Sequence, residues 1–126
     1  MLRYLTRQIN AGTKFDPKMD MRFGFPRFSA ENIAANMPIV DLTRRFAENK
    51  NATPAQISLV WLLAQEPFIV PIPGTRNIDH LNENLGAINV QLAPADLREI
   101  DAAFSKIKVH GGRMNAEQMK VVDQSA

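Results

Sequence analysis

The chain has 126 residues, of which 45% are hydrophobic and 22% are charged, and its formal net charge is +2. This composition fits one globular domain with a hydrophobic core and excludes disordered and collagen-like chains. The absence of cysteine excludes a disulfide scaffold, a cysteine nucleophile and a cysteine-ligated zinc site. No apolar run approaches the ~20 residues of a membrane-spanning helix, and no secretory signal is visible. We expect a cytoplasmic protein that binds neither membranes nor nucleic acid.

Residues 1–28 form an irregular start, because glycine and proline interrupt them and no apolar period lasts two turns. Compact domains rarely carry such a stretch beyond ~12 to 15 residues unless it is functional or packs on something else. Ser29 is then positioned to cap a helix over residues 30–48. Pro38 lies inside that helix, which leaves either one kinked helix or two pieces joined near Met37.

The clearest start signal of a helix lies at residues 53–56, where threonine, proline and glutamine occupy the positions of a capping box. The helix that follows is apolar nearly all the way round, which indicates burial on most of its surface. We expect it to end at Pro67. Trp61 and Phe104 have the helical spacing of core residues, and Phe68 has that of a buried strand.

A short apolar run from Phe68 to Ile72 is typical of a β-strand covered on both faces. Pro71 lies within it and cannot donate to a ladder, so it should lie at a bulge or beside a missing partner. The sequence contains no second strand of comparable quality. A lone strand of the buried type therefore predicts a sheet whose other strands lie outside these 126 residues.

After this strand we expect a tight turn capped by Asn77, a helix over residues 78–87, another over residues 94–106, and a mobile tail over residues 108–126. The first of these helices carries three apolar residues that should face inward: Ile78, Leu81 and Leu85. Ala93 is a poor cap for the second helix.

The turn before the helix at residue 78 has the features of a phosphate-binding loop. Gly74 lets backbone approach an anion, the Thr75 hydroxyl donates, Arg76 supplies a charge, and the helix N-terminus adds about half a positive charge. An ordinary turn is the alternative, because such sequences are common. Glu83 and Asn84 follow on the helix and have two interpretations, ribose or ring contacts and a solvated face.

Other chemistry has little support in the sequence. His80 and His110 are the only histidines, and neither has carboxylates at metal-ligand spacing, so we expect no metal site. Tyr4 is the only tyrosine, and it lies in the irregular start.

Several segments together resemble the C-terminal part of the aldo-keto reductase family. The resemblance is ordered along nearly the whole chain. Its segments are residues 26–29 (PRFS), 52–65 (ATPAQISLVWLLAQ), 69–75 (IVPIPGT), 81–86 (LNENLG) and 92–101 (LAPADLREID), with a looser match at 4–6 (YLT).

This resemblance implies an α/β fold, the C-terminal part of a (β/α)8 barrel, a fold that takes about 250 residues or more. Residues 1–126 would form a single partial domain, with residues 68–72 as its eighth strand. Family members transfer hydride between NADPH and a carbonyl with an Asp, a Tyr, a Lys and a His, all of which match positions upstream of Met1. Tyr4 matches a residue after strand seven and not the catalytic tyrosine.

The resemblance also implies the cofactor contacts. Gly74, Thr75 and Arg76 match the segment at the adenosine phosphate, and Glu83 and Asn84 match the pair near the adenine. His80 stands where many members have an arginine for the 2′-phosphate, so NADP is the expected cofactor and NAD the alternative. Arg3 and Arg7 stand where the family tends to have glycine at the pyrophosphate-facing loop.

Two functional hypotheses follow. The first is an NADPH-dependent oxidoreductase portion that is inactive alone and associates with itself or with a missing N-terminal portion. The second is a free-standing helical binding module without catalytic activity. A DNA-binding helix-turn-helix would be one form of the second hypothesis. The sequence disfavours it, because the helix after Thr53 has almost no polar face to present to a DNA groove.

Overall fold

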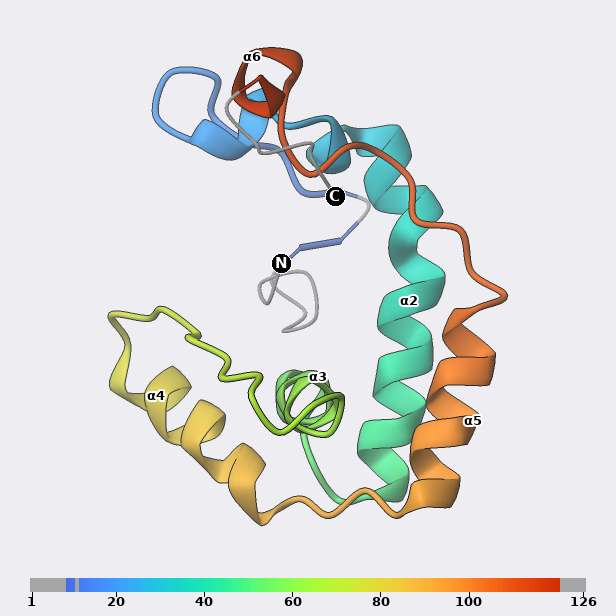
Figure 1. Ribbon diagram of the computed structural model, residues 1–126. Helices are drawn as coiled ribbons and strands as arrows, with labels where there is room; N and C mark the ends of the chain where they lie inside the picture. Colours follow the sequence, from blue (N-terminus) through green and yellow to red (C-terminus); the bar gives the residue numbers. More distant parts are fainter. Residues whose placement is uncertain (1–8, 11, 121–126) are drawn as a thin grey trace. The chain divides into compact units, whose positions relative to one another are not determined.

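A computed structural model describes residues 9–10 and 12–120 of the chain (Figure 1). The described residues form only helices and connecting segments. In chain order these are the 3-10 turns η1 (Met21–Gly24) and η2 (Pro26–Phe28), then α2 (Ala30–Asn49), α3 (Pro54–Leu63), α4 (Ile78–Leu85), η3 (Gly86–Asn89), α5 (Pro94–Phe104) and α6 (Ala116–Met119).

The described residues divide into two compact units. The first unit contains residues 38–107, and the second contains residues 9–37 together with 108–120. Helix α2 is continuous through Pro38, the residue at which the units divide, so the alternative of two separate helical pieces is wrong. The single partial domain expected from the sequence stays a prediction.

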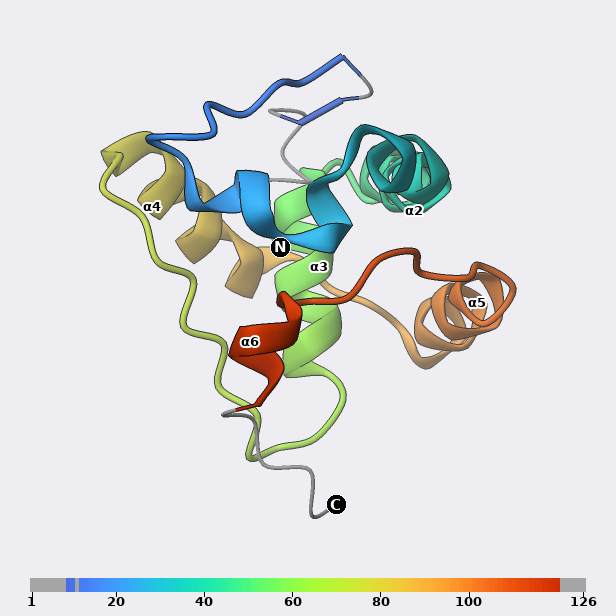
Figure 2. The same cartoon turned by 90° about the horizontal axis from the view of Figure 1, so that it is seen from above.

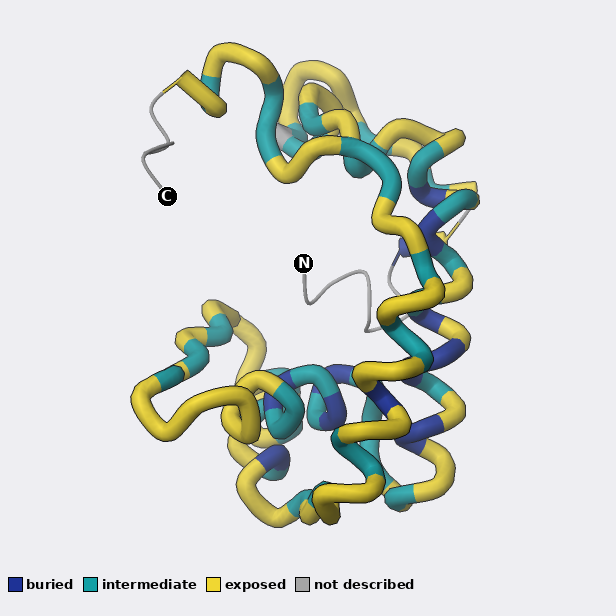
Figure 3. The backbone as a smooth tube through the Cα atoms, turned by 45° about the vertical axis from the view of Figure 1, so that its right-hand side comes forward, coloured by how far each residue is buried: buried dark blue, intermediate teal, exposed yellow. Residues whose placement is uncertain are grey.

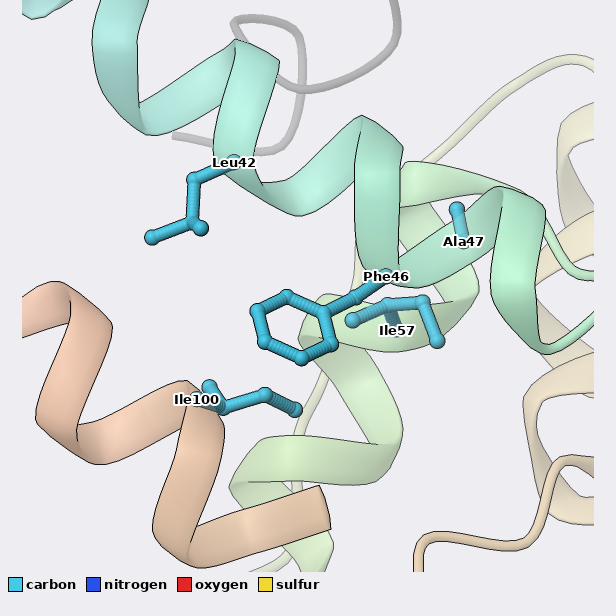
Figure 4. Close-up of a cluster of buried hydrophobic side chains, with 5 residues drawn as sticks. All are labelled: Leu42, Phe46, Ala47, Ile57 and Ile100. Carbon is cyan, nitrogen blue, oxygen red and sulfur yellow. The ribbon is translucent and has the colours of Figure 1, made fainter.

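The core of the first unit forms where α2, α3 and α5 meet (Figure 4). These helices bring together the buried side chains of Leu42, Phe46, Ala47, Ile57 and Ile100. The Trp61 and Phe104 rings pack edge to face with centroids 6.2 Å apart beside this core. The predicted helices and the packing role of these two aromatic rings are confirmed, except that the helix after Thr53 ends at Leu63 and not at Pro67.

Hydrogen bonds at the helix starts confirm the predicted caps. The Ser29 hydroxyl accepts from the Asn32 N–H at 3.2 Å at the start of α2. Thr53 and Gln56 form the reciprocal capping box of α3. Asn77 caps α4, accepting at 2.8 Å from the second N–H after it. Ala93 offers α5 no side chain, but its N–H donates to the Asp96 carboxylate at 2.7 Å.

Residues 68–72 do not form a β-strand in this structure, so the predicted strand is not confirmed. They lie in an open connection between α3 and α4 (Figure 2), and the side chain of Phe68 is 78% exposed rather than in a core. The physical reason is that a strand is defined by a hydrogen-bonded neighbour, and the described residues supply none.

The expected orientation of α4 is wrong. Its apolar residues Ile78, Leu81 and Leu85 are 65%, 41% and 57% exposed. The helix instead contacts α3 (Figure 2), and its Glu83 and Asn84 are half-buried. The sequence shows the apolar stripe of α4, but it does not show which part of this or another polypeptide packs against that stripe.

The second unit is held by aromatic side chains and by backbone-directed hydrogen bonds. The rings of Phe15 and Phe28 meet edge to face at 5.5 Å, and the Arg22 guanidinium lies 4.6 Å from the Phe15 ring centroid. The Arg27 guanidinium donates to the Gly111 carbonyl at 3.3 Å. This bond anchors residues near the start of the tail to the segment before α2.

Candidate functional site

The loop before α4 is ordered by hydrogen bonds of its own. The Thr75 hydroxyl accepts from the Asn77 N–H at 3.1 Å and lies 3.4 Å from the Asn77 carbonyl, to which it donates. The Asn77 carboxamide oxygen in turn accepts from the N–H groups of Asp79, at 2.8 Å, and His80, at 3.4 Å. The first turn of α4 is therefore capped from within, and the loop has a defined shape before any ligand arrives.

Open space and positive charge lie at the beginning of this loop. Apart from Gly74 and its two chain neighbours, no residue places an atom within 4 Å of the position that a Cβ on Gly74 would occupy, so a ligand can approach the backbone there. Arg76 is exposed and forms no ion pair with the described residues. Asp79, in the first turn, opposes the positive field of the helix N-terminus. An anion would therefore depend on Arg76 for its charge partner.

The other candidate residues lie on one face of α4. His80, Glu83 and Asn84 are spaced three and four residues apart, which places them side by side on a helix, and all three are half-buried. The structure thus gathers all the predicted cofactor residues on one loop–helix segment. Gly74, Thr75 and Arg76 lie in the loop, and the remaining three lie on the helix.

Gln56 is a further residue of the site that sequence reasoning recognised only as a cap. Its side-chain oxygen accepts from the Thr53 N–H at 3.0 Å, and its side-chain nitrogen donates to the Glu83 carbonyl at 2.9 Å. The Gln56 carboxamide thereby caps the N-terminus of α3 and links it to α4. The signal for this second role is chemical, because an amide offers donors as well as an acceptor.

Within the described part of the chain, no group of His, Asp and Glu residues is arranged to hold a metal ion. In the same part, none of the helices is long and apolar enough to cross a membrane. Tyr4, Arg3 and Arg7 lie outside the described residues, so the expectations for them stay predictions.

With this geometry in place, sequence comparison decides the family. The aldo/keto reductase family model matches residues 1–104. This chain belongs to the aldo/keto reductase family. The resemblance found in the sequence is therefore confirmed, and the family is one of oxidoreductases. A free-standing helical binding module is not favoured.

Curated relatives support the same family. "Aldo-keto reductase yakc [NADP(+)]" of Schizosaccharomyces pombe is 42% identical over 97 residues, which are 77% of this chain and 28% of the relative. "Probable aldo-keto reductase 1" of Glycine max is 47% identical over 88 residues, 70% of this chain and 25% of the relative. "Aldo-keto reductase str7" of Strobilurus tenacellus is 35% identical over 109 residues, 86% of this chain and 32% of the relative.

The matched part of the chain thus spans about a quarter to a third of the length of these aldo-keto reductases. No solved structure matches the chain.

Proposed function

We propose that this chain forms the C-terminal, cofactor-binding portion of an aldo-keto reductase, within a (β/α)8 barrel that reduces a carbonyl with NADPH. Membership of the family supports the oxidoreductase assignment. The S. pombe relative carries NADP(+) in its name, which supports a nicotinamide nucleotide as the ligand. The observation that carries the proposal is the open, self-ordered loop at Gly74, with the exposed Arg76 beside it.

Each candidate residue has a defined part in this proposal. Arg76 neutralises the phosphate on the adenosine, and Gly74 lets that phosphate approach the backbone. Thr75 keeps the loop in shape and adds a hydroxyl donor. On α4, Glu83 and Asn84 hydrogen-bond the adenine or ribose, and His80 lies near the 2′-phosphate of NADP.

The chain alone is proposed to bind nucleotide without turning it over. When bound, the nicotinamide supplies a hydride to the carbonyl, and that transfer needs a proton donor held beside both reactants. We assign no catalytic residue to this chain. The catalytic Asp, Tyr, Lys and His of the family are proposed to come from the rest of the barrel.

Nucleotide titration of the purified full chain tests the proposal. NADPH fluorescence is followed as protein is added, with the aggregation state checked by light scattering. We expect saturable binding that Arg76→Ala weakens by about ten-fold or more, because charge-assisted hydrogen bonds to phosphate contribute about 1.5–3 kcal/mol. Gly74→Ala should also weaken binding, although a methyl group there meets no protein atom.

Arg98→Ala provides the matched control. Arg98 is an exposed arginine on α5, so its loss changes the net charge by the same amount without touching the loop. The proposal fails if NADPH shows no saturable binding at millimolar concentration in a monodisperse sample. It also fails if Arg76→Ala and Arg98→Ala weaken binding equally.

A further inference from the structure

The segment proposed to hold phosphate carries more negative than positive charge. In residues 74–86 the fixed charges are one cation, Arg76, and two carboxylates, Asp79 and Glu83. With a neutral His80, one positive charge against two negative charges gives this segment a formal charge of −1. That charge opposes a phosphate monoester, which is itself close to doubly negative at neutral pH. The segment therefore needs a further positive charge when a phosphate arrives.

His80 is the side chain of this segment that can supply that charge. An imidazole changes its charge between pH 5 and 8, whereas guanidinium and carboxylate groups ordinarily keep theirs over this range. The loop before α4 is exposed from residue 74 to residue 79 (Figure 3), and His80 is the first half-buried residue after it. A charge gained at a half-buried position is screened less by salt than a charge on an exposed side chain.

Few charged groups in the described part of the chain face His80. On α4 these are Glu83, one turn further along the helix, and Asp79, the preceding residue. In the loop there is the guanidinium of Arg76. Helix α4 packs against α3 and η3, and neither of these elements contains a titratable residue. A bound phosphate would thus add a large negative charge to a small set of groups around this ring.

We infer that His80 takes up a proton when a nucleotide with a 2′-phosphate binds, so that the preference for NADPH over NADH rises as the pH falls. This inference rests on the proposed function, because that function places the 2′-phosphate near His80. The proton comes from solvent, and the protonated ring donates a hydrogen bond to a phosphate oxygen.

The sign of the pH dependence follows from linkage. A phosphate stabilises an imidazolium and not a neutral imidazole, so the proton and NADPH each raise the affinity for the other. NADH lacks the 2′-phosphate, so its binding is coupled to this proton only weakly. Below about pH 6 the phosphate of the ligand takes up a proton of its own and loses charge. The preference should therefore change between pH 8 and pH 6.5.

Fluorescence titrations of the full chain with NADPH and with NADH test the inference. They are carried out at pH 8 and at pH 6.5, at one ionic strength. We expect the ratio of the two affinities to rise by about three-fold or more as the pH falls, which is the size of effect of a partly exposed charge pair. Calorimetry in buffers of different ionisation enthalpy gives a second readout that needs no variant. At pH 7, NADPH binding should take up more protons than NADH binding.

Two variants isolate the proton on residue 80. His80→Gln cannot become charged, and His80→Arg is charged at both pH values. Both keep the backbone N–H that donates to the Asn77 side chain, so the cap of α4 is preserved. The affinity ratio should change less than two-fold with pH in either variant, and it should be low in His80→Gln and high in His80→Arg. Titration of the ligand's phosphate is common to all three chains and cannot produce this difference.

The outcomes separate this inference from the proposed function. Saturable NADPH binding with an affinity ratio that does not change with pH overturns the inference and leaves the proposed function standing. The same holds if His80→Gln shows the pH dependence of the unaltered chain, or if NADPH and NADH take up equal numbers of protons. Absence of saturable NADPH binding at both pH values overturns the inference together with the proposed function. A ratio that rises with acidity in the unaltered chain alone supports the inference.

Discussion

Asn36 and His110 hold each other through two hydrogen bonds of 2.8 Å. The side-chain nitrogen of Asn36 donates to the His110 carbonyl, and the backbone N–H of His110 donates to the side-chain oxygen of Asn36. The Asn36 side chain is buried in α2, so one carboxamide satisfies both backbone groups of a residue far away in the sequence. This pair ties the segment after residue 107 to the first half of α2.

Asn36→Ala should therefore release that segment. The change leaves a backbone N–H and a carbonyl of His110 without partners, at a cost of about 2 kcal/mol. We expect a lower urea midpoint and faster hydrogen exchange of the His110 amide. Asn49→Ala, at an exposed asparagine of the same helix, is the control and should change neither quantity. Unchanged exchange at His110 would contradict the role assigned to Asn36.

Gly111 is predicted to tolerate no side chain. Its φ is +81°, and an added Cβ would lie 2.7 Å from the Arg27 Cα and 2.8 Å from the Arg27 nitrogen. Because both are backbone atoms, Gly111→Ala combines strain of about 1–2 kcal/mol with a clash that no rotamer relieves. Gly24→Ala is the control, since nothing lies within 4 Å there. Equal urea midpoints for the two variants would refute this prediction.

Local signals in the sequence predicted the helix starts well, because a cap depends only on neighbouring residues. Ser29, Thr53 and Asn77 each accept the expected N–H, and the helices that follow them begin where predicted. The candidate phosphate-binding loop could also be proposed from neighbouring residues alone. The loop at Gly74 is contiguous in sequence, so its composition was sufficient to propose it as a site, and its binding role stays a prediction.

Contacts over long distances were not predictable in the same way. The apolar stripe of α4 was visible, but whether Leu81 faces its own protein or a partner depends on a surface elsewhere. The pairing of Gln56 with Glu83 likewise joins two helices whose approach no local pattern specifies. The strand expected at residues 68–72 depends on a neighbouring strand that the described residues do not contain.

The ion pair between Lys50 and Asp96 gives a prediction for acid pH. The Lys50 ammonium hydrogen-bonds the Asp96 carboxylate, and with the Ala93 N–H it lowers the pKa of Asp96. A carboxyl whose pKa is lower in the folded state stabilises the fold above its unfolded value of about 3.9, and that contribution disappears as the pH falls through the folded pKa.

Lys50→Gln should consequently raise the pKa of Asp96 toward about 3.9, though not fully, because the Ala93 N–H bond remains. Titration of the Asp96 carboxyl carbon by NMR measures this directly. Urea midpoints between pH 5 and 2 should fall less steeply for Asp96→Asn than for the unaltered chain. A pKa of Asp96 that does not move in Lys50→Gln would show that the ammonium does not set it.

Gln56→Glu should loosen α4 while leaving the start of α3 intact. The carboxylate still accepts from the Thr53 N–H, but it cannot donate to the Glu83 carbonyl. Loss of about 1 kcal/mol should speed amide exchange in α4 several-fold and weaken NADPH binding, with exchange in α3 unchanged. Gln91→Glu adds the same charge at an exposed position and is the control. Equal exchange in both variants would remove Gln56 from the support of the site.

Nucleotide preference should respond to residue 80. A guanidinium binds a phosphate through paired hydrogen bonds, which an imidazole cannot match, so His80→Arg should raise the affinity for NADPH over NADH by about ten-fold. Asn82→Arg is the matched control, because it adds the same charge to the exposed side of α4. Fluorescence titrations with both nucleotides give the ratio. A gain of equal size for NADPH and NADH, or the same gain from Asn82→Arg, would mean that general charge attraction, and not contact of residue 80 with the 2′-phosphate, sets the preference.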